Sequence, residues 1–156
     1  MNKEITIYYE EYEHWSSLSG QEQGMIEKAY QMCETAYAPY SKFHVGATVL
    51  LSNGTIVSGN NQENIAYPSG LCAERVALFY VGANHPKEQI DTIVVVAKGD
   101  LVPEDKLLSP CGGCRQVMLE SEMRQEKNIR VVLVNQIGKT IVFHSIKDLV
   151  PFAFGL

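Results

Sequence analysis

The stretch IRVVLVNQIGKTIVFH, residues 129–144, decides how the end of this chain folds. Two runs rich in β-branched and aromatic residues, 129–134 and 140–144, are typical of strands, and Gly138 supplies a turn between them. Only residues 135–139 separate the two runs. Because a parallel crossover needs a dozen or more residues, these two strands must run antiparallel.

Earlier segments alternate between strand and helix patterns. Apolar runs at 45–51 and 55–58 flank Asn53-Gly54, a pair typical of a hairpin turn. The run at 90–97 contains consecutive apolar β-branched residues, as in strands covered on both faces. Helical spacing predicts helices over 72–82 and 110–122, the second with a proline at its first position. The order implies an α/β fold in three layers, α-β-α, with a five-stranded mixed sheet.

One more helix is predicted near the N-terminus. Ser19 and Glu22 have the spacing of a capping box, and apolar residues recur at helical spacing between 26 and 37. Pro39 ends this helix, because proline lacks the amide hydrogen and restricts the residue before it. Ahead of it, the alternation over 5–9 is a weak strand pattern in an N-terminal extension.

Composition limits the class of protein. The 156 residues are 46% hydrophobic with a net charge of −5, which fits one globular domain over 1–156, with 1–19 as an extension to a core of about 20–156. Basic residues are scattered, whereas polynucleotide-binding proteins show a basic face. No run approaches the ~18 apolar residues of a membrane span, and no apolar run follows a basic start. We therefore expect a cytoplasmic protein that binds neither nucleic acid nor membrane.

Three of the four cysteines fall at the expected starts of two helices. Cys72 opens one helix, and Cys111 and Cys114 lie in PCGGCRQ at the start of the other. Helix N-termini favour thiolates, and three thiolates bind zinc while leaving its fourth position open, as in catalytic sites. Glu74, two residues after Cys72, is then placed to act on a water at that position as general base and then general acid.

Alternatives to a catalytic zinc site remain open. Cys33 would complete a structural site of four thiolates, although its apolar neighbours are typical of a buried free cysteine. Cys111 and Cys114 also have the spacing of a redox dithiol. Three thiolates with Zn²⁺ leave one negative charge, and Arg75 either offsets it or forms an ordinary surface salt bridge.

Several blocks in the same order cover the chain from about Ala36 to Phe154, and together they resemble the small, homotetrameric, zinc-dependent cytidine deaminases. The resemblance implies the three-layer fold of that family, one zinc per chain, and a homotetramer with shared active sites. It also implies hydrolytic deamination of cytidine and 2′-deoxycytidine to uridine and 2′-deoxyuridine plus ammonia, a step of pyrimidine salvage. The matching blocks are residues 38–47, 59–64, 72–75, 110–118 and 149–154.

The resemblance also assigns roles to individual residues. Glu74 moves the water's proton to the pyrimidine N3 and then delivers one to the departing amine. Two departures stand out: Ile65, where the family usually has a small residue and where we expect crowding at a subunit junction, and Asn60, where a cysteine is common. The substrate roles fall to Asn61 and Glu63 on the ribose, Phe43 against the pyrimidine, the Ala73 backbone at the base edge, and Tyr67 and Phe154 reaching into a neighbouring subunit's site.

Related deaminases act on tRNA, single-stranded DNA, deoxycytidylate or blasticidin S. The short link between the last two strands and the acidic charge oppose a polynucleotide enzyme, and no cations cluster near Asn61 or Phe43 to bind a phosphate. A blasticidin S deaminase is the nearest alternative substrate class. A non-catalytic zinc-binding module is the alternative from another class, although such a module has no use for Glu74.

Overall fold

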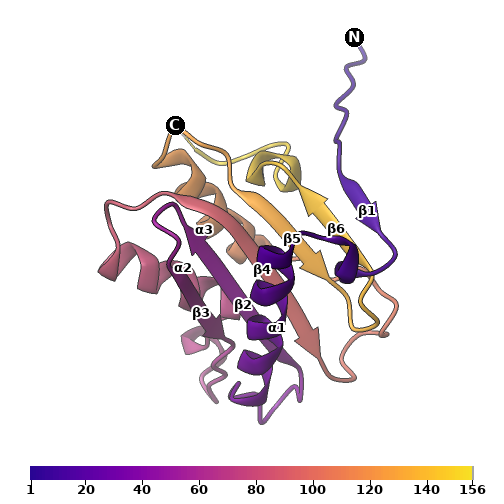
Figure 1. The fold of residues 1–156 in the computed structure, drawn as a ribbon, viewed down its shortest axis with the longest axis vertical. Helices are drawn as coiled ribbons and strands as arrows, with labels where there is room; N and C mark the ends of the chain where they lie inside the picture. Colours follow the sequence, from indigo (N-terminus) through magenta and orange to yellow (C-terminus); the bar gives the residue numbers. More distant parts are fainter. Residues whose placement is uncertain (156) are drawn as a thin grey trace.

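A computed structural model describes residues 1–155 of the chain; residue 156, the last of the expected domain, lies outside the described residues. Six strands form one mixed sheet in the order β1-β6-β5-β4-β2-β3, with α1 on one face and α2 and α3 on the other (Figure 1). The elements are β1 Glu10–Tyr12, α1 Gly20–Glu34, β2 His44–Leu51, β3 Ile56–Asn60, α2 Ala73–Asn84, β4 Ile90–Lys98, α3 Gly112–Met123, β5 Arg130–Val134 and β6 Thr140–Phe143, with short 3₁₀ turns η1 Trp15–Ser17, η2 Tyr67–Ser69 and η3 Ile146–Leu149.

The sheet has the mixed topology that the sequence predicts. β2 and β3 form an antiparallel hairpin whose turn contains Gly54 at a φ of 85°, a conformation that glycine adopts freely. β5 and β6 are antiparallel, as the short link between them requires. β4 and β5 are parallel and are joined through α3. The three-layer α/β fold is therefore confirmed.

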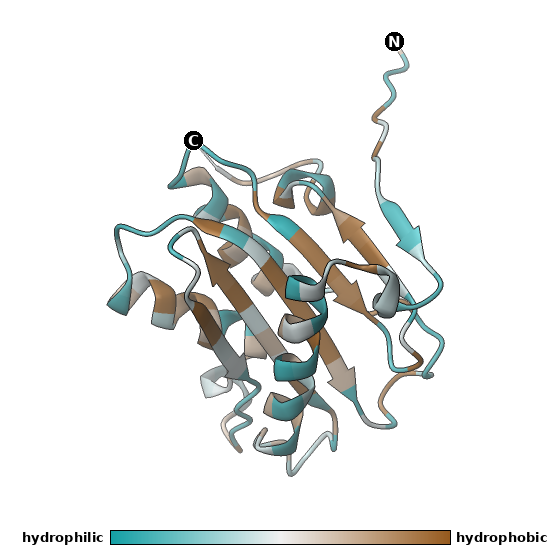
Figure 2. Cartoon of the chain, in the orientation of Figure 1, coloured by the Kyte–Doolittle hydropathy of each residue, from teal (hydrophilic) through white to brown (hydrophobic). Residues whose placement is uncertain are grey.

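Two hydrophobic cores lie on opposite faces of the sheet. Side chains of a strand alternate between its faces, so Ile93 and Val95 of β4 pack towards α2 and α3 while Val94 and Val96 pack towards α1. Figure 2 shows the central strands as the hydrophobic part of the chain, with hydrophilic residues on the outer helix surfaces and on β1. This two-sided burial explains the unbroken apolar run that the sequence shows in β4.

Two glycines let the helices come close to the sheet. A Cβ on Gly46 of β2 would lie 1.9 Å from the Ala29 carbonyl oxygen of α1. A Cβ on Gly59 of β3 would lie 2.8 Å from the Ala73 carbonyl oxygen, at the first residue of α2. Both distances are too short for any side chain. Gly59 therefore allows the N-terminus of α2 to sit against the end of β3.

All three helices differ from their expected bounds: α2 spans Ala73–Asn84 rather than 72–82, and two further differences concern α1 and α3. The capping box at Ser19 and Glu22 is present, but α1 ends at Glu34, and Tyr37 beyond it is an exposed residue. Pro110 is not the first residue of α3, because Cys111 is the N-cap and the helix begins at Gly112. In both places local composition predicted the helix but not the residue at which it begins or ends.

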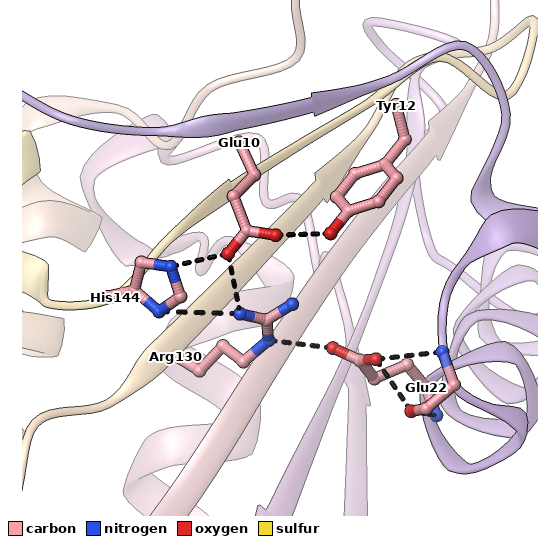
Figure 3. Close-up of polar contacts among 6 residues, drawn as sticks. Glu10, Tyr12, Glu22, Arg130 and His144 are labelled. Carbon is pink, nitrogen blue, oxygen red and sulfur yellow. Dashed lines mark hydrogen bonds and ion pairs between the residues drawn. The ribbon is translucent and has the colours of Figure 1, made fainter.

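The expected count of five strands is wrong, because the N-terminal extension adds β1 to the β6 edge. Strand pairing joins Glu10 to Val142 and Tyr12 to Thr140, whereas the alternating residues 5–9 are not part of a strand. Figure 3 shows the side-chain contacts that accompany this pairing: the Glu10 carboxylate accepts a hydrogen bond from Tyr12 and lies against Arg130 and His144. Arg130, His144 and the whole of β6 are distant in sequence from β1, so the local pattern does not reveal the strand.

Across residues 1–155, no helix combines the length and the apolar character needed to cross a membrane.

Candidate metal and substrate site

The N-terminus of α2 supplies one thiol and one carboxylate. Cys72 is the N-cap of α2, with an extended backbone (φ −71°, ψ 156°), and Glu74 lies in the first turn. Glu74 is only 4% exposed. The helix start therefore brings a sulfur and a buried carboxylate to one place.

The N-terminus of α3 supplies two thiols. Cys111 is the N-cap and Cys114 lies in the first turn, so the two sulfurs face each other at 3.4 Å. The Cys72 sulfur lies 4.0 Å from that of Cys111, and all three sulfurs are within 4.8 Å of one another. Thiolates bound to zinc at about 2.3 Å in a tetrahedron stand about 3.8 Å apart, so this spacing fits a zinc ion.

Hydrogen bonding in this cluster favours thiolate at Cys72. The bond from Cys114 lowers the pKa of the Cys72 thiol to about 5, against burial, and Arg75 contributes in the same direction. The same bond raises the pKa of the Cys114 thiol, so hydrogen bonding favours thiolate at one of the two sulfurs at the expense of the other. A soft divalent cation removes that conflict, because it favours every sulfur as thiolate.

Glu74 and Arg75 carry unpaired buried atoms. Among residues 1–155, the buried side-chain nitrogen and oxygen atoms without a hydrogen-bond partner are Glu74 Oε2 and Arg75 Nε. Burial raises the pKa of the Glu74 carboxyl to about 7. A buried polar atom without a partner costs free energy, so its presence here points to a partner that is a ligand.

Arg75 also reaches the sulfur cluster. Its Nη2 atom lies 3.9 Å from the Cys72 sulfur, close enough for a hydrogen bond to sulfur. The guanidinium therefore faces the thiolates rather than a surface carboxylate. This position fits the expectation that Arg75 offsets their negative charge.

A cavity of about 490 Å³ opens beside Cys72. Its wall includes Asn61 and Glu63, the expected ribose-binding pair, and Tyr67, whose side chain is 74% exposed. The lining residues are Tyr40, Ser41, Asn61, Gln62, Glu63, Asn64, Tyr67, Gly70, Leu71, Cys72 and Arg75.

Asn61 and Glu63 also hold the wall of this cavity together. The Asn61 amide accepts from the Val45 backbone N–H at 2.8 Å and donates to the Phe43 carbonyl at 2.8 Å. The Glu63 carboxylate accepts from the Tyr40 backbone N–H at 2.9 Å and also from the Ser41 hydroxyl and backbone N–H. An amide has two donor hydrogens and a carboxylate about four acceptor sites, so both side chains keep capacity for a ligand.

Comparison with known proteins agrees with this geometry. Residues 19–129 match the family model described as the cytidine and deoxycytidylate deaminase zinc-binding region. A cytidine deaminase of Halalkalibacterium halodurans is 36% identical over 85% of this chain and 92% of its own length, and one of Mycobacterium tuberculosis is 34% identical over 91% and 90%. The crystal structure of a Burkholderia pseudomallei cytidine deaminase has a TM-score of 0.73 and 37% identity, covering 88% of this chain and 100% of that chain.

The chain belongs to the cytidine and deoxycytidylate deaminase family. Family membership and the three converging sulfurs together show that its cofactor is zinc. The family match begins at residue 19, so β1 and η1 precede it.

Other family positions lie outside the lining of the cavity. Ala73 is fully buried at the start of α2, and Phe43 is half-buried just before β2. Phe154, in contrast, is 87% exposed, and its carbonyl accepts from Gln116 of α3. Ile65 is 81% exposed and does not line the cavity. Of the predicted site residues, the cavity is therefore lined by Asn61, Glu63, Tyr67, Cys72 and Arg75, and not by Phe43, Ala73, Glu74, Cys111, Cys114 or Phe154.

Arg115 is a residue that the sequence-based reasoning missed. Its guanidinium donates to the Pro110 carbonyl at 2.9 Å, the Leu149 carbonyl at 2.9 Å and the Ser109 hydroxyl at 2.7 Å. It thereby fixes the loop that leads into Cys111 and joins it to η3. The sequence places Arg115 next to a cysteine but does not reveal these backbone partners.

Proposed function

We propose that this chain catalyses the hydrolytic deamination of free cytidine and 2′-deoxycytidine to uridine and 2′-deoxyuridine, releasing ammonia. The observation that carries the proposal is the unpartnered Oε2 atom of buried Glu74 beside three thiols within 4.8 Å of one another. A purely structural metal site gives no reason to bury a carboxylate with one oxygen unsatisfied. The cytidine deaminases among its relatives support the choice of nucleoside.

In this reaction Cys72, Cys111 and Cys114 hold the zinc, which when bound acidifies water and so supplies the nucleophile for C4 of the pyrimidine. A C–O bond forms at C4 and the C–N bond to the exocyclic amine breaks. Glu74 moves two protons: it takes one from water and passes it to N3, then takes the one on the new C4 hydroxyl and gives it to the departing amine, so that C4 becomes the carbonyl of uridine. A pKa raised to about 7 by burial suits a carboxyl that must both accept and donate near neutral pH.

The remaining roles concern charge and binding. Arg75 offsets the negative charge left on three thiolates with one Zn²⁺. Asn61 and Glu63 bind the ribose hydroxyls with the donor and acceptor sites that the wall contacts leave free. Phe43 lies against the pyrimidine, and the Ala73 backbone contacts the base edge.

We further propose a homotetramer in which neighbouring chains share active sites. Phe154 and Tyr67 are highly exposed in the single chain, at 87% and 74%, although large aromatic side chains are usually buried or in contact with a partner. A neighbouring chain would cover them and complete each cavity. We expect the assembly in the cytoplasm, where thiol ligands stay reduced.

A spectrophotometric assay with cytidine, 2′-deoxycytidine, cytidine monophosphate and blasticidin S tests the proposal, with zinc per chain measured on the same sample. Turnover of both free nucleosides with one zinc per chain is the expected result. Turnover of blasticidin S alone would contradict the proposed substrate class, and a full zinc content with no turnover would contradict the enzymatic role.

A further inference from the structure

Asn60, the last residue of β3, has a side chain whose polar atoms are all engaged. It is 7% exposed. Its Nδ2 atom donates to the Met32 carbonyl and to the Thr35 hydroxyl, both at 3.0 Å. Its Oδ1 atom accepts from Gln62 Nε2 at 2.7 Å. One buried amide therefore joins the C-terminal end of α1 to the segment that follows β3.

The residues next to Asn60 form part of the cavity wall. Asn61, Gln62 and Glu63 all line the cavity. Their side chains alternate in what they contact: Asn61 and Glu63 bind residues between 40 and 45, where the chain enters β2, whereas Gln62 binds Asn60. This alternation is that of an extended chain with two faces.

The backbone of this segment has neighbours on both sides. Gln62 exchanges two hydrogen bonds with Leu71, each 2.9 Å, just before Cys72. On the other side, Tyr37 donates to the Asn61 carbonyl at 3.1 Å and accepts from the Glu63 N–H at 2.8 Å. Gln62 therefore forms isolated β-bridges with Tyr37 on one side and Leu71 on the other, and Asn60 anchors the end at which the segment leaves the sheet.

We propose that Asn60 is a positioning residue for nucleoside binding, holding residues 61–63 against α1 so that Asn61 and Glu63 meet the ribose. This inference rests on the proposed function and extends it to a residue that touches neither the substrate nor the metal. The hydrogen bonds of the Asn60 side chain run to Met32, Thr35 and Gln62 and to none of the three thiols, so we expect it to act on binding and not on zinc.

Loss of the Asn60 amide removes one donor from the Met32 carbonyl and one from the Thr35 hydroxyl, and it removes the acceptor of the Gln62 amide. The link between α1 and residue 62 is then broken, and these partly exposed groups turn to water or shift to find other partners. A shift of about 1 Å in a binding group changes catalysis by up to ~10²-fold. Because the affected segment faces the sugar, the substrate KM rises while kcat, set by Glu74 and the metal, stays close to its original value.

Asn60→Ala and Asn60→Asp test this proposal, with Asn53→Ala as the matched control. Asn53 lies in the turn at the other end of the same hairpin, where its side chain accepts from the Thr55 N–H at 2.9 Å. Asn60→Asp keeps the shape and the acceptor for Gln62 but cannot donate to Met32 or Thr35. Each variant is measured for KM and kcat with cytidine, uridine binding by calorimetry, zinc per chain, and melting temperature.

We expect both Asn60 variants to raise the cytidine KM and the uridine Kd about tenfold, with kcat within about twofold and zinc unchanged. Asn53→Ala lowers the melting temperature but leaves KM and Kd unchanged. If Asn60→Ala does not fold, Thr35→Val, at an exposed position, raises KM by about twofold to threefold through loss of one acceptor.

Wild-type activity with an unmoved KM in the Asn60 variants would overturn this inference alone. An equal change of KM in Asn53→Ala would also overturn it, because the effect would then follow from general destabilisation of the hairpin. A wild-type chain that neither turns over cytidine nor binds uridine would overturn the proposed function and this inference with it.

Discussion

Polar side chains at the two edges of the sheet differ in whether they have hydrogen-bond partners. Beside β3, at the start of α2, Glu74 and Arg75 each keep a buried atom without a partner. Beside β6, the cluster of Glu10, Arg130 and Glu22 satisfies its members mutually, with Arg130 between the two carboxylates (Figure 3). Unpaired buried groups cost stability, and paired ones contribute to it. We call the first group, Glu74 and Arg75, the unpaired end, where a ligand is expected. We call the second, Glu10, Glu22 and Arg130, the paired end, which stabilises the fold.

The largest expected effect comes from the unpaired end. Glu74→Gln removes the group that moves the proton, so we expect turnover of cytidine to fall by about 10²–10⁴-fold. The melting temperature stays the same or rises, because the variant removes a buried carboxyl with an unsatisfied oxygen. Steady-state kinetics, zinc content and a thermal melt check both parts.

Glu120→Gln is the matched control for that variant. Glu120 lies on α3 with a side chain 56% exposed, in an ion pair with Arg124 at 3.8 Å. It should leave turnover and zinc content unchanged. Turnover of Glu74→Gln equal to that of the wild type would contradict the proposed proton transfer.

At the paired end, Gly138→Ala should have the largest effect on stability. Gly138 has a φ of 92°, and a Cβ there would lie 2.4 Å from the His14 ring. Strain at such a position costs about 1–3 kcal/mol, so we expect the free energy of unfolding to fall by about that amount. Activity per zinc should not change, and urea unfolding measures the loss.

Two further variants distinguish backbone strain at Gly138 from steric contact with the His14 ring. Gly24→Ala in α1 meets no atom within 4 Å and should stabilise the chain by about 0.5–1 kcal/mol. His14→Ala in the Gly138→Ala background should recover the part of the loss that comes from the ring. Equal stability of Gly138→Ala and the wild type would show that the extension is not held against the β5–β6 turn.

The sequence predicted the parts of the fold that local patterns carry. Asn53-Gly54 indicated the β2–β3 hairpin, and the short link over 135–139 required antiparallel β5 and β6. β1 was missed, because Glu10–Tyr12 has no apolar alternation and pairs through partners more than a hundred residues away. A strand defined by its partner cannot be recognised from its own residues.

The residues of the candidate site also fall into those that local sequence predicts and those that depend on partners distant in sequence. The spacing of Cys111 and Cys114 and the position of Cys72 at a helix start predicted the convergence that the structure shows. The contacts of Asn60 and Arg115 were not predictable, because their partners are backbone carbonyls brought close only by the fold. Motif residues can be identified from sequence, whereas the residues that position them require the structure.

Arg130→Gln should lower the free energy of unfolding by less than Gly138→Ala does. Arg130 donates to Glu22 at 2.8 Å and to Glu10 at 3.4 Å, with its side chain 28% exposed. Partly exposed ion pairs contribute little singly, so we expect a loss of about 1 kcal/mol at neutral pH. Arg124→Gln, which breaks the exposed pair with Glu120, should cost less than this. A larger loss in Arg124→Gln would contradict the importance given to the cluster.

The smallest expected effect is the pH dependence of the stability loss in Arg130→Gln. The hydrogen bond from Tyr12, and the nearby charges of Arg130 and His144, lower the pKa of Glu10 below its ordinary value of 4.5. Burial alone would raise the pKa of Glu22, but hydrogen bonds from Ser19 and Arg130 outweigh it and lower the value. A carboxyl with a depressed folded pKa adds stability above its unfolded pKa and loses that stability as pH falls through the folded value.

The stability difference between wild type and Arg130→Gln should therefore shrink as pH falls below the ordinary value of 4.5. Urea unfolding of both chains at a series of pH values measures the difference directly. Because Arg130 keeps its charge throughout, the change below pH 4.5 reports protonation of the two carboxylates that it contacts, Glu10 and Glu22, and the same series in a His144→Gln background removes the imidazole that contacts Glu10 and Arg130. A difference that persists undiminished to about pH 3 would mean that Arg130 stabilises the β6 edge by packing and not through these carboxylates.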